Sequence, residues 1–364
     1  MYLVRYSEIA LKSEPVRRRW EDVLITNIQK ALPGVKVKKE RGRIWLYGPV
    51  DPEKLRRVFG IVSFSEVEHC TLEELNHAIL DFCERTGLRE AGTFALRLRR
   101  VGDHTFHSQE KTIELADLIL DRFTNLKVNL DHPDATVFVE IRDDNAYLFR
   151  DAVKGAGGIP LGVEGKLVAL FSGGIDSPAA AWMMMKRGCK IIPVYVDMET
   201  FSSESALERA QAVIAVLRAY QPDLELKVVK DRFMVSAKEA LNKADLDSYT
   251  CILCKRRMYR LAEQVAREVG AKGIVTGESI GQVASQTLDN LFVLDSCATM
   301  PVYRPLIGFD KVDAERIARE IGTFEPSILP ADGCKAVPHK PSTKARLAKV
   351  KDIEDELELS SRSN

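Results

Sequence analysis

Hydrophobic and polar positions follow two different periods along the first 150 residues. Apolar residues recur at helical spacing in segments 14–32, 71–87 and 108–123, and a short helix is expected over 51–60. Apolar and polar residues alternate, or apolar runs are short, in the expected strands 2–9, 35–48, 93–101, 128–130, 135–144 and 145–152. This mixture predicts two small α+β domains, residues 1–60 and 61–153.

The pattern changes after a glycine-rich segment. Residues 154–165 contain five glycines and one proline, which predicts a linker. Beyond it, expected strands 167–171, 189–198, 224–229 and 272–277 alternate with expected helices 178–188, 204–220, 254–270 and 311–322. Strands that alternate with helices indicate an α/β fold with a doubly wound parallel sheet. We assign this domain to residues 166–345 and a C-terminal tail to residues 346–364.

Composition is that of a globular protein of two or three domains. The 364 residues are 45% hydrophobic and 29% charged. No apolar run reaches the length of about 18 residues that a membrane helix needs, and the first residues lack the apolar core of a signal peptide. We therefore expect a cytoplasmic protein without a membrane partner.

Charge is balanced overall but not along the chain. The 53 basic and 53 acidic residues cancel, yet residues 1–50 hold 11 Lys and Arg against 5 Asp and Glu. In the expected strand 93–101, Arg97 and Arg99 alternate with apolar residues, and Arg100 follows them. Together with Lys12 and Arg17, these side chains are candidates for binding nucleic acid. A solvated surface is the alternative interpretation.

The segment Ser172–Ser177, with sequence SGGIDS, follows the first buried strand after the linker. Gly173 and Gly174 let backbone N–H groups approach a ligand closely. Ser177 is a suitable N-cap and Pro178 a suitable first helical residue, so we expect a helix N-terminus that stabilises an anion. In doubly wound sheets this loop usually holds the ligand.

The loop also carries a carboxylate, Asp176. It lacks the spacing and the lysine of a Walker A motif. A carboxylate beside an anion site is useful when it shares a Mg²⁺ ion with phosphate groups. The alternative is a tight glycine-rich turn with a surface aspartate.

The seven cysteines fall into two groups. Without an export signal they indicate thiol chemistry or metal binding rather than disulfides. Four lie in apolar or mixed stretches and are expected in the core: Cys70, Cys83, Cys189 and Cys297. Cys251 and Cys254 form a C-x-x-C pair, and Cys334 is a third candidate. Three thiolates suit an iron–sulfur cluster with one open iron, a redox or persulfide trio, or zinc with His339 as the nearest fourth ligand.

The SGGIDS loop resembles the pyrophosphate-binding loop of the ATP pyrophosphatases. The segment TGESIGQVASQTL (276–288), the linker GGIPLGVEGK and the opening RYSEIALK resemble the tRNA 4-thiouridine synthetase family over nearly the whole chain. The resemblance implies a ferredoxin-like domain, a THUMP domain that binds tRNA, and a PP-loop ATP pyrophosphatase domain, in that order.

The resemblance also implies functional residues. Its nucleotide-binding positions correspond to Leu170, Phe171, Ser172, Gly173, Gly174, Asp176, Ser177, Tyr195, Val196, Arg256, Gly277 and Gln286. For Leu170, Phe171 and Val196, a place in the core of the sheet is compatible with binding through the backbone. Cys334 matches the cysteine that handles sulfur. The chain ends about 30 residues later, without the rhodanese-like domain that carries the persulfide in many members. Members of this form are associated with a cluster.

The function that the resemblance implies is ATP-dependent sulfur transfer to tRNA, which gives 4-thiouridine at position 8. Uridine would be adenylated with Asp176 as a catalytic residue, and sulfur at Cys334 or on a [4Fe–4S] cluster held by Cys251, Cys254 and Cys334 would displace AMP. Expected cofactors are ATP, Mg²⁺ and this cluster. Expected partners are tRNA, a sulfide or persulfide donor and, as one candidate assembly, a second copy. Alternatives are a thiolase for another tRNA base, a tRNA-binding protein with a vestigial ATP site, and a sulfur carrier for thiamine-thiazole synthesis.

Overall fold

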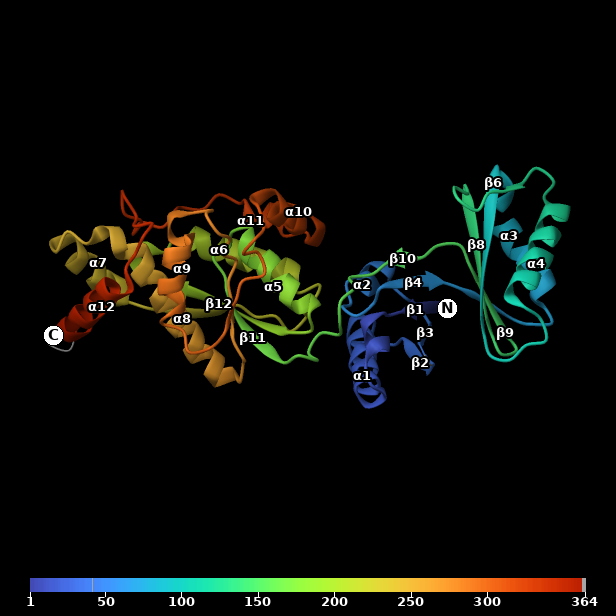
Figure 1. Cartoon of the computed structure of the whole chain (residues 1–364), viewed down its shortest axis with the longest axis horizontal. Coiled ribbons are helices and arrows are strands. Elements are labelled where there is room, and N and C mark those ends of the chain that lie inside the picture. The colour runs from blue at the N-terminus through green and yellow to red at the C-terminus, as the bar shows by residue number, and fades with distance from the viewer. Residues whose placement is uncertain (41, 362–364) are drawn as a thin grey trace. The chain divides into compact units, whose positions relative to one another are not determined.

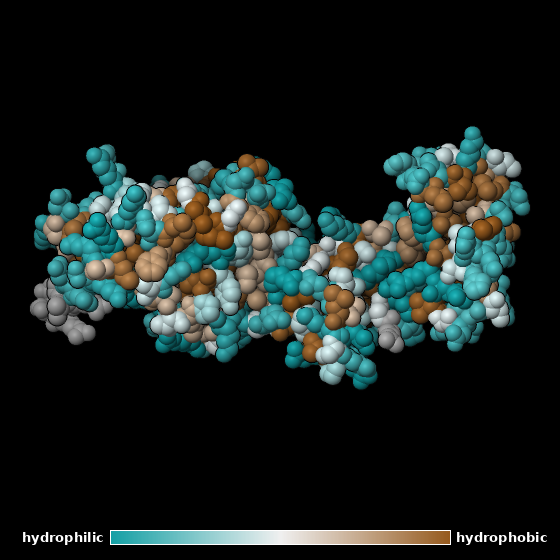
Figure 2. Space-filling view, in the orientation of Figure 1, coloured by the Kyte–Doolittle hydropathy of each residue, from teal (hydrophilic) through white to brown (hydrophobic). Residues whose placement is uncertain are grey.

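The computed structural model describes residues 1–40 and 42–361 and divides into two compact units, Met1–Gly157 and Gly158–Asn364 (Figure 1). The division lies within the segment 154–165 that the sequence indicates as a linker. Within the described residues, no helix is both long enough and apolar enough to cross a membrane. Hydrophobic residues are interspersed among polar ones on the face shown in Figure 2.

The first unit contains two five-stranded sheets. The first sheet is antiparallel, with strand order β10-β4-β1-β3-β2. Its elements are β1 (Tyr2–Arg5), α1 (Glu14–Ala31), β2 (Lys36–Glu40), β3 (Arg43–Tyr47), α2 (Pro52–Arg56), β4 (Ser63–Glu66) and β10 (Val153–Lys154). Helix α1 buries Trp20, Leu24 and Ile28, which recur every four residues and therefore share one face.

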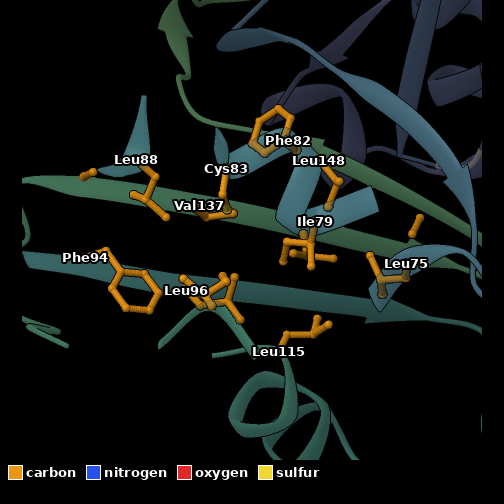
Figure 3. Packing of buried hydrophobic residues seen from close by; sticks show 14 of the residues in the cluster. Leu75, Ile79, Phe82, Cys83, Leu88, Phe94, Leu96, Leu115, Val137 and Leu148 are labelled. Atoms are coloured by element: carbon orange, nitrogen blue, oxygen red, sulfur yellow. The ribbon is translucent and has the colours of Figure 1, made fainter. Parts of the chain in front are cut away.

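The second sheet has the order β5-β9-β8-β6-β7. Its elements are β5 (Glu68–Thr71), α3 (Leu75–Arg85), β6 (Thr93–Val101), α4 (Ser108–Arg122), β7 (Lys127–Val128), β8 (Ala135–Arg142) and β9 (Asn145–Phe149). Ile79 of α3 and Leu115 of α4 pack with Phe94, Leu96 and Val137 of the strands (Figure 3). Both helices bury their apolar faces in this core, which confirms the α+β expectation for this part of the chain.

A buried ion pair joins the two sheets of the first unit. Arg43 of β3 donates from Nε and Nη2 to the carboxylate of Glu140 in β8, at 3.0 Å and 2.9 Å. Arg142 donates to the same carboxylate at 2.7 Å. Burial by itself would raise the pKa of Glu140, but the two arginines outweigh it and hold the pKa below its usual range. Beside this pair, the rings of Trp45 and Tyr147 stack with centroids 4.1 Å apart.

The second unit is built on a parallel sheet with the order β13-β12-β11-β14-β15. The strands are β11 (Lys166–Leu170), β12 (Lys190–Asp197), β13 (Lys227–Lys230), β14 (Ile274–Val275) and β15 (Val302–Tyr303). The chain builds outward from β11 to β13 and then returns to the other side of β11. This confirms the predicted doubly wound sheet and puts its topological switch point between β11 and β14.

Eight helices surround this sheet in the described part of the chain: α5 (Asp176–Lys186), α6 (Glu204–Leu217), α7 (Phe233–Lys243), α8 (Thr250–Val269), α9 (Leu288–Asp295), α10 (Lys311–Ile321), α11 (Phe324–Ser327) and α12 (Leu347–Ser361). Helices α7 and α8 pack on one face in a core with Val168 and Val194. In the described residues of both units, short 3₁₀ helices connect these elements: η1 (Glu8–Leu11), η2 (Leu88–Glu90), η3 (Glu199–Phe201), η4 (Asp247–Tyr249) and η5 (Ala284–Gln286).

Two local expectations differ from the structure. Helix α5 begins at Asp176, so Ser177 lies inside it, because Ile175 already has helical dihedral angles (φ −61°, ψ −35°). The expected tail contains helix α12, whose Val350 and Ile353 are buried. Residues 362–364 of that tail lie outside the described residues.

Helix α12 is fixed by a buried carboxylate. Glu354 accepts from Nε and Nη2 of Arg256 in α8 at 2.8 Å and 2.7 Å, and from Arg260 at 2.8 Å. Arg256 is only 2% exposed and also donates to Val293 and Ser296 of the α9 region. One guanidinium therefore joins α8, α9 and α12.

We expect Glu354→Ala to lower the free energy of unfolding of the second unit by about 3–5 kcal/mol, because it leaves a buried guanidinium without its counter-ion. Burial opposes ionisation of Glu354, but Arg256 and Arg260 lower its pKa, so the stabilisation is present at neutral pH and is lost as the pH falls through that lowered pKa. Urea titrations at several pH values measure both effects. Asp352→Ala, at an exposed position of α12, is the control, and an equal loss in both variants would contradict this account.

Candidate functional site

The SGGIDS loop connects β11 to α5 at the switch point of the parallel sheet. Gly173 adopts φ +75°, a conformation that favours glycine. A Cβ at this position would lie 3.0 Å from the backbone nitrogen of Ala210 and 3.3 Å from the carbonyl oxygen of Ala206. Glycine at this position therefore lets the loop lie directly against helix α6.

The loop after β14 packs on the SGGIDS loop through Gly277. A Cβ on Gly277 would lie 2.6 Å from the carbonyl carbon of Asp176 and 2.7 Å from the nitrogen of Ser177. These distances are shorter than any side chain tolerates, so glycine is required here by the neighbouring backbone. The resemblance implies a nucleotide contact at this position, and the structure shows a backbone-to-backbone contact between the two loops.

Gln286 shapes the rest of this second loop. Its side-chain oxygen accepts from the backbone nitrogen of Ser279 at 3.3 Å, and its carbonyl oxygen accepts from Gly281 at 2.9 Å. The loop closed in this way brings Gln282 to Asp176, where Nε2 donates to Oδ2 at 3.0 Å. Gln286 thus positions the loop that contacts Asp176.

Asp176 also pairs with Lys311, the first residue of α10. The Nζ atom of Lys311 lies 2.8 Å from Oδ1 and 3.1 Å from Oδ2. No local pattern in the sequence selects Lys311, because 135 residues separate it from Asp176. The pair places one cation and one carboxylate beside the glycine loop, which is the charge pattern of a site for phosphate and a divalent metal ion.

A cavity of about 320 Å³ opens at the carboxyl ends of β11 and β12. Five of the expected nucleotide-binding residues line it: Leu170, Phe171, Ser172, Tyr195 and Val196. The apolar side chains of Met198, Phe201, Met234 and Met258 extend this lining. The volume and the apolar walls suit a planar heterocycle. The glycine loop begins at the edge of the cavity, where charged groups attached to such a heterocycle would extend out of it.

Two of the three candidate cysteines line the same cavity. Cys254 of α8 is half-buried and Cys334 is exposed, while half-buried Cys251 lies one turn before Cys254 on α8. Burial, and then the neighbouring Cys334 and Cys251, raise the pKa of Cys254 to about 12. Burial and Cys334 likewise raise the pKa of Cys251. Cys254 and Cys334 therefore share one cavity, with Cys251 one turn away on α8, and thiols are ligands that iron and zinc bind.

Across residues 1–40 and 42–361, no group of three or more His, Cys, Asp or Glu side chains is arranged as a metal site. His339 is exposed and does not complete a set with the three cysteines. The other cysteines are placed as expected for packing: Cys70, Cys83 and Cys189 are buried, and Cys297 is half-buried with its Sγ against the carbonyl oxygen of Leu294.

The segment that carries Cys334 is held from two sides. On one side, the nitrogen of Asp332 donates to the hydroxyl of Ser205 at 3.2 Å at the start of α6. On the other, Nζ of Lys238 in α7 donates to the carbonyl oxygen of Ala336 at 3.1 Å and pairs with Asp247. These contacts place Cys334 between the N-terminal ends of α6 and α8.

A second buried carboxylate, Glu278, holds the helix that carries the C-x-x-C pair. Glu278 accepts from Lys255 at 2.9 Å, from the hydroxyl of Tyr259 at 2.6 Å and from Nε of Arg304 at 2.8 Å. Burial alone would raise its pKa, but Lys255, Tyr259 and Arg304 outweigh it and lower the pKa to about 2. Because Lys255 follows Cys254 directly, this network fixes the start of α8 relative to β14.

Arg256 lies away from the cavity. The resemblance implies that it binds the nucleotide, but its guanidinium is occupied by Glu354, Val293 and Ser296, and it does not line the cavity. Its position on α8 directs it to the opposite side from Cys254, toward α9 and α12. In this structure Arg256 therefore supports the helices around the site.

The candidate nucleic-acid residues separate into two groups. Arg97 and Arg99 are exposed on β6, as the alternation in this strand predicts. Arg100 turns to the other face, where it donates to the carbonyl oxygens of His104 at 3.3 Å and Phe106 at 2.7 Å. It therefore holds a loop of its own unit. This difference follows from the two-residue period of a strand.

The two remaining candidates lie near the start of the chain. Exposed Lys12 places Nζ 4.8 Å from the centre of the Trp20 ring. Arg17 pairs with Glu21 one turn further along α1 at 3.8 Å. Both cations keep contact with their own unit while remaining at its surface.

The fold and the cavity define a PP-loop protein. Its α/β unit follows two smaller α+β regions, each built on one five-stranded sheet. A family model described as Thiamine biosynthesis protein (ThiI) matches residues 162–359. A ThiI ferredoxin-like domain model matches residues 1–65, and a THUMP domain model matches residues 70–151.

Curated relatives and a solved structure agree with these matches. A probable tRNA sulfurtransferase of Methanothermobacter thermautotrophicus is 40% identical over 94% of this chain and 89% of its own length. One from Caldanaerobacter subterraneus is 39% identical over 98% of this chain and 95% of its own length. The crystal structure of a 4-thiouridine synthetase–RNA complex with bound ATP matches with a TM-score of 0.86 and 37% identity, over 98% of this chain and 94% of that one. The chain therefore belongs to the ThiI family of tRNA sulfurtransferases.

We expect Gly277→Ala to lower the free energy of unfolding by about 1–3 kcal/mol, because the added methyl group overlaps the backbone of Asp176 and Ser177. Chemical denaturation followed by tryptophan fluorescence measures the loss. Gly308→Ala is the control, since a Cβ at Gly308 meets nothing within 4 Å. Equal stability of the two variants would show that the loops do not pack as described.

Proposed function

We propose that this protein is an ATP-dependent tRNA sulfurtransferase that adenylates uridine at position 8 of tRNA and replaces its O4 with sulfur. One observation carries the proposal: a single cavity joins the start of the SGGIDS loop to Cys254 and Cys334. The cavity thus places the loop that would bind ATP next to the cysteines that would present sulfur. The RNA and the ATP bound in the related synthetase structure support tRNA and ATP as the substrates.

ATP would bind with its adenine in the cavity and its phosphates on the glycine loop. Apolar walls from Phe171 and Val196 would cover the base, and backbone N–H groups of Gly173 and Gly174 would face the phosphates. Asp176 would share a Mg²⁺ ion with the phosphates. The ammonium group of Lys311, which pairs with Asp176 at 2.8 Å, would then contact the phosphate groups.

The first chemical step forms a bond between uridine O4 and the α-phosphorus of ATP, and the bond to pyrophosphate breaks. Negative charge develops on the phosphate oxygens as this happens. Cations and backbone donors already fixed around the loop stabilise that charge without rearrangement. The product is a uridine whose O4 is attached to AMP, which is a better leaving group than the original oxygen.

In the second step sulfur attacks C4, the C4–O4 bond breaks, and AMP leaves with the oxygen. We propose that sulfide is the source, either free or released from a persulfide carrier by a thiol reductant, which is oxidised to a disulfide as the persulfide sulfur is reduced. Cys251, Cys254 and Cys334 are the residues that would hold a [4Fe–4S] cluster, and such a cluster would supply iron as a binding site for sulfide. The contribution of the chain itself would be to hold the start of α8 through the bond from Lys255 to Glu278, and the segment of Cys334 through the bond from Lys238 to Ala336.

Transfer RNA would be held by the first unit, in which we propose a ferredoxin-like domain over residues 1–60 and a THUMP domain over residues 61–153. Arg97 and Arg99 are the exposed cations of β6, and Lys12 is exposed near the start of the chain. Phosphate contacts of this kind fix the register of the RNA without reading its sequence.

Asp176→Asn is expected to reduce pyrophosphate release from ATP and tRNA by at least about 100-fold, because the Mg²⁺ ligand is lost. Affinity for tRNA should stay within about twofold, since the RNA is held elsewhere. A coupled pyrophosphate assay and filter binding measure the two quantities. Asp289→Asn, at an exposed position of α9, is the control. Pyrophosphate release at the wild-type rate in Asp176→Asn would refute the assigned role.

For the cysteines, we expect Cys251→Ala, Cys254→Ala and Cys334→Ala each to lose iron and 4-thiouridine formation together, when they are prepared without oxygen. Pyrophosphate release should continue, because the glycine loop is separate. Cys297→Ala, which removes a thiol bonded only to backbone, should keep iron and activity. A wild-type protein that is fully active without iron, or an active Cys251→Ala variant, would contradict the cluster.

For tRNA, the double variant Arg97→Gln, Arg99→Gln should weaken binding and reduce the slope of log affinity against log salt, by about 0.7–0.9 for each phosphate group that the protein no longer neutralises. Binding measured from low to moderate salt gives this slope. Arg100→Gln is the control, because Arg100 lies on the opposite face of β6 from Arg97 and Arg99 and is only partly exposed. A slope equal to that of the wild type would show that Arg97 and Arg99 are only a solvated surface.

A further inference from the structure

Arg209, on the second turn of α6, lies beside the glycine loop. It lines the same cavity as Phe171, Ser172 and Cys334. A Cβ built on Gly173 would be 3.3 Å from Nε of Arg209, so the guanidinium approaches the loop from helix α6. Neither the charge pattern nor the motifs in the sequence single out Arg209.

The hydrogen-bonding capacity of Arg209 is largely unused. Its Nε atom is shielded from solvent and has no hydrogen-bond partner among the described residues. Nη1 donates to the carbonyl oxygen of Leu329 at 3.4 Å, which is a long hydrogen bond. Within residues 1–40 and 42–361, no carboxylate lies within ion-pair distance of this guanidinium.

This arrangement differs from that of the other cations around the site. Lys311 is paired with Asp176 and Lys255 with Glu278. A buried donor without a partner costs about 1–3 kcal/mol, so a group left in this state beside a ligand cavity points to a ligand that satisfies it. The chemistry of a guanidinium selects an oxyanion, and phosphate matches its planar set of donors well.

We propose that Arg209 binds a phosphate group of ATP at the SGGIDS loop. The inference rests on the proposed function, since it takes ATP as the substrate. Arg209 contacts the phosphates from the side of α6, and Lys311 and the Mg²⁺ site lie on the side of α5. The guanidinium stabilises the charge that moves onto pyrophosphate when the bond to the α-phosphorus breaks.

The contact with Leu329 adds a consequence for sulfur transfer. Leu329 lies five residues before Cys334, in the segment that also contacts the start of α6 through Asp332. A guanidinium that bridges the phosphates and this carbonyl oxygen links nucleotide binding to the position of the Cys334 segment. Phosphate binding is nevertheless the primary role, and it can be measured without tRNA or sulfur.

The test compares three ligands with the whole protein: MgATP, Mg-pyrophosphate and adenosine, each measured by isothermal titration calorimetry. In Arg209→Gln, we expect the affinities for MgATP and pyrophosphate to fall at least about tenfold, as for the loss of a charge-assisted hydrogen bond. Adenosine, which has no phosphate, should bind within about twofold of the wild type. Arg209→Lys, which keeps the charge, should recover part of the loss.

Arg218→Gln is the matched control, because Arg218 caps the same helix and donates to Leu224 at 2.9 Å, away from the loop. Unchanged MgATP affinity in Arg209→Gln would overturn the proposal. An equal loss for adenosine and MgATP, with a lowered melting temperature, would overturn it in favour of a packing role. A wild-type protein that binds neither MgATP nor pyrophosphate would instead refute the proposed function itself.

Discussion

The parallel pairing of β11 with β14 is the constraint on which the site depends. Val168 and Ala169 pair with Ile274 and Val275, so the loops that follow the two strands leave the sheet at the same edge. Their backbones touch at Gly277, where no side chain fits. Because the chain crosses over between these strands, residues from distant parts of the sequence meet at Asp176. The proposed nucleotide site lies at this edge because the sheet topology brings these two loops together there.

Buried charge then fixes the helix that carries the cysteine pair. Helix α8 is held to the strand side by Glu278 through Lys255 and to the C-terminal helix by Glu354 through Arg256. Each carboxylate is stable inside the protein only because cations surround it, and removing either partner leaves a buried charge. These ion pairs fix the start of α8, which carries Cys251 and Cys254. Hydrogen bonds with Ser205 of α6 and Lys238 of α7 hold the segment that carries Cys334.

The sequence predicts the local parts of this arrangement well. Alternation in segment 93–101 identifies a strand with Arg97 and Arg99 outside, and the periodic helices around the parallel sheet follow from the same reasoning. It does not predict contacts between segments far apart in the chain. Lys311 is an ordinary first residue of a helix until the fold brings it to Asp176, 135 residues away. The orientation of Arg256 could not be predicted either, because its partner Glu354 lies in α12, within the segment expected to be a tail.

In the proposed reaction, ATP activates the uridine oxygen, and sulfur then displaces this oxygen as part of AMP. The most direct test uses tRNA whose target uridine carries a heavy oxygen isotope at O4, incubated with the protein, MgATP and sulfide without oxygen. Mass spectrometry of the released AMP should find one heavy oxygen for each 4-thiouridine formed. Unlabelled AMP, with the heavy oxygen in water or retained in the RNA, would contradict the account.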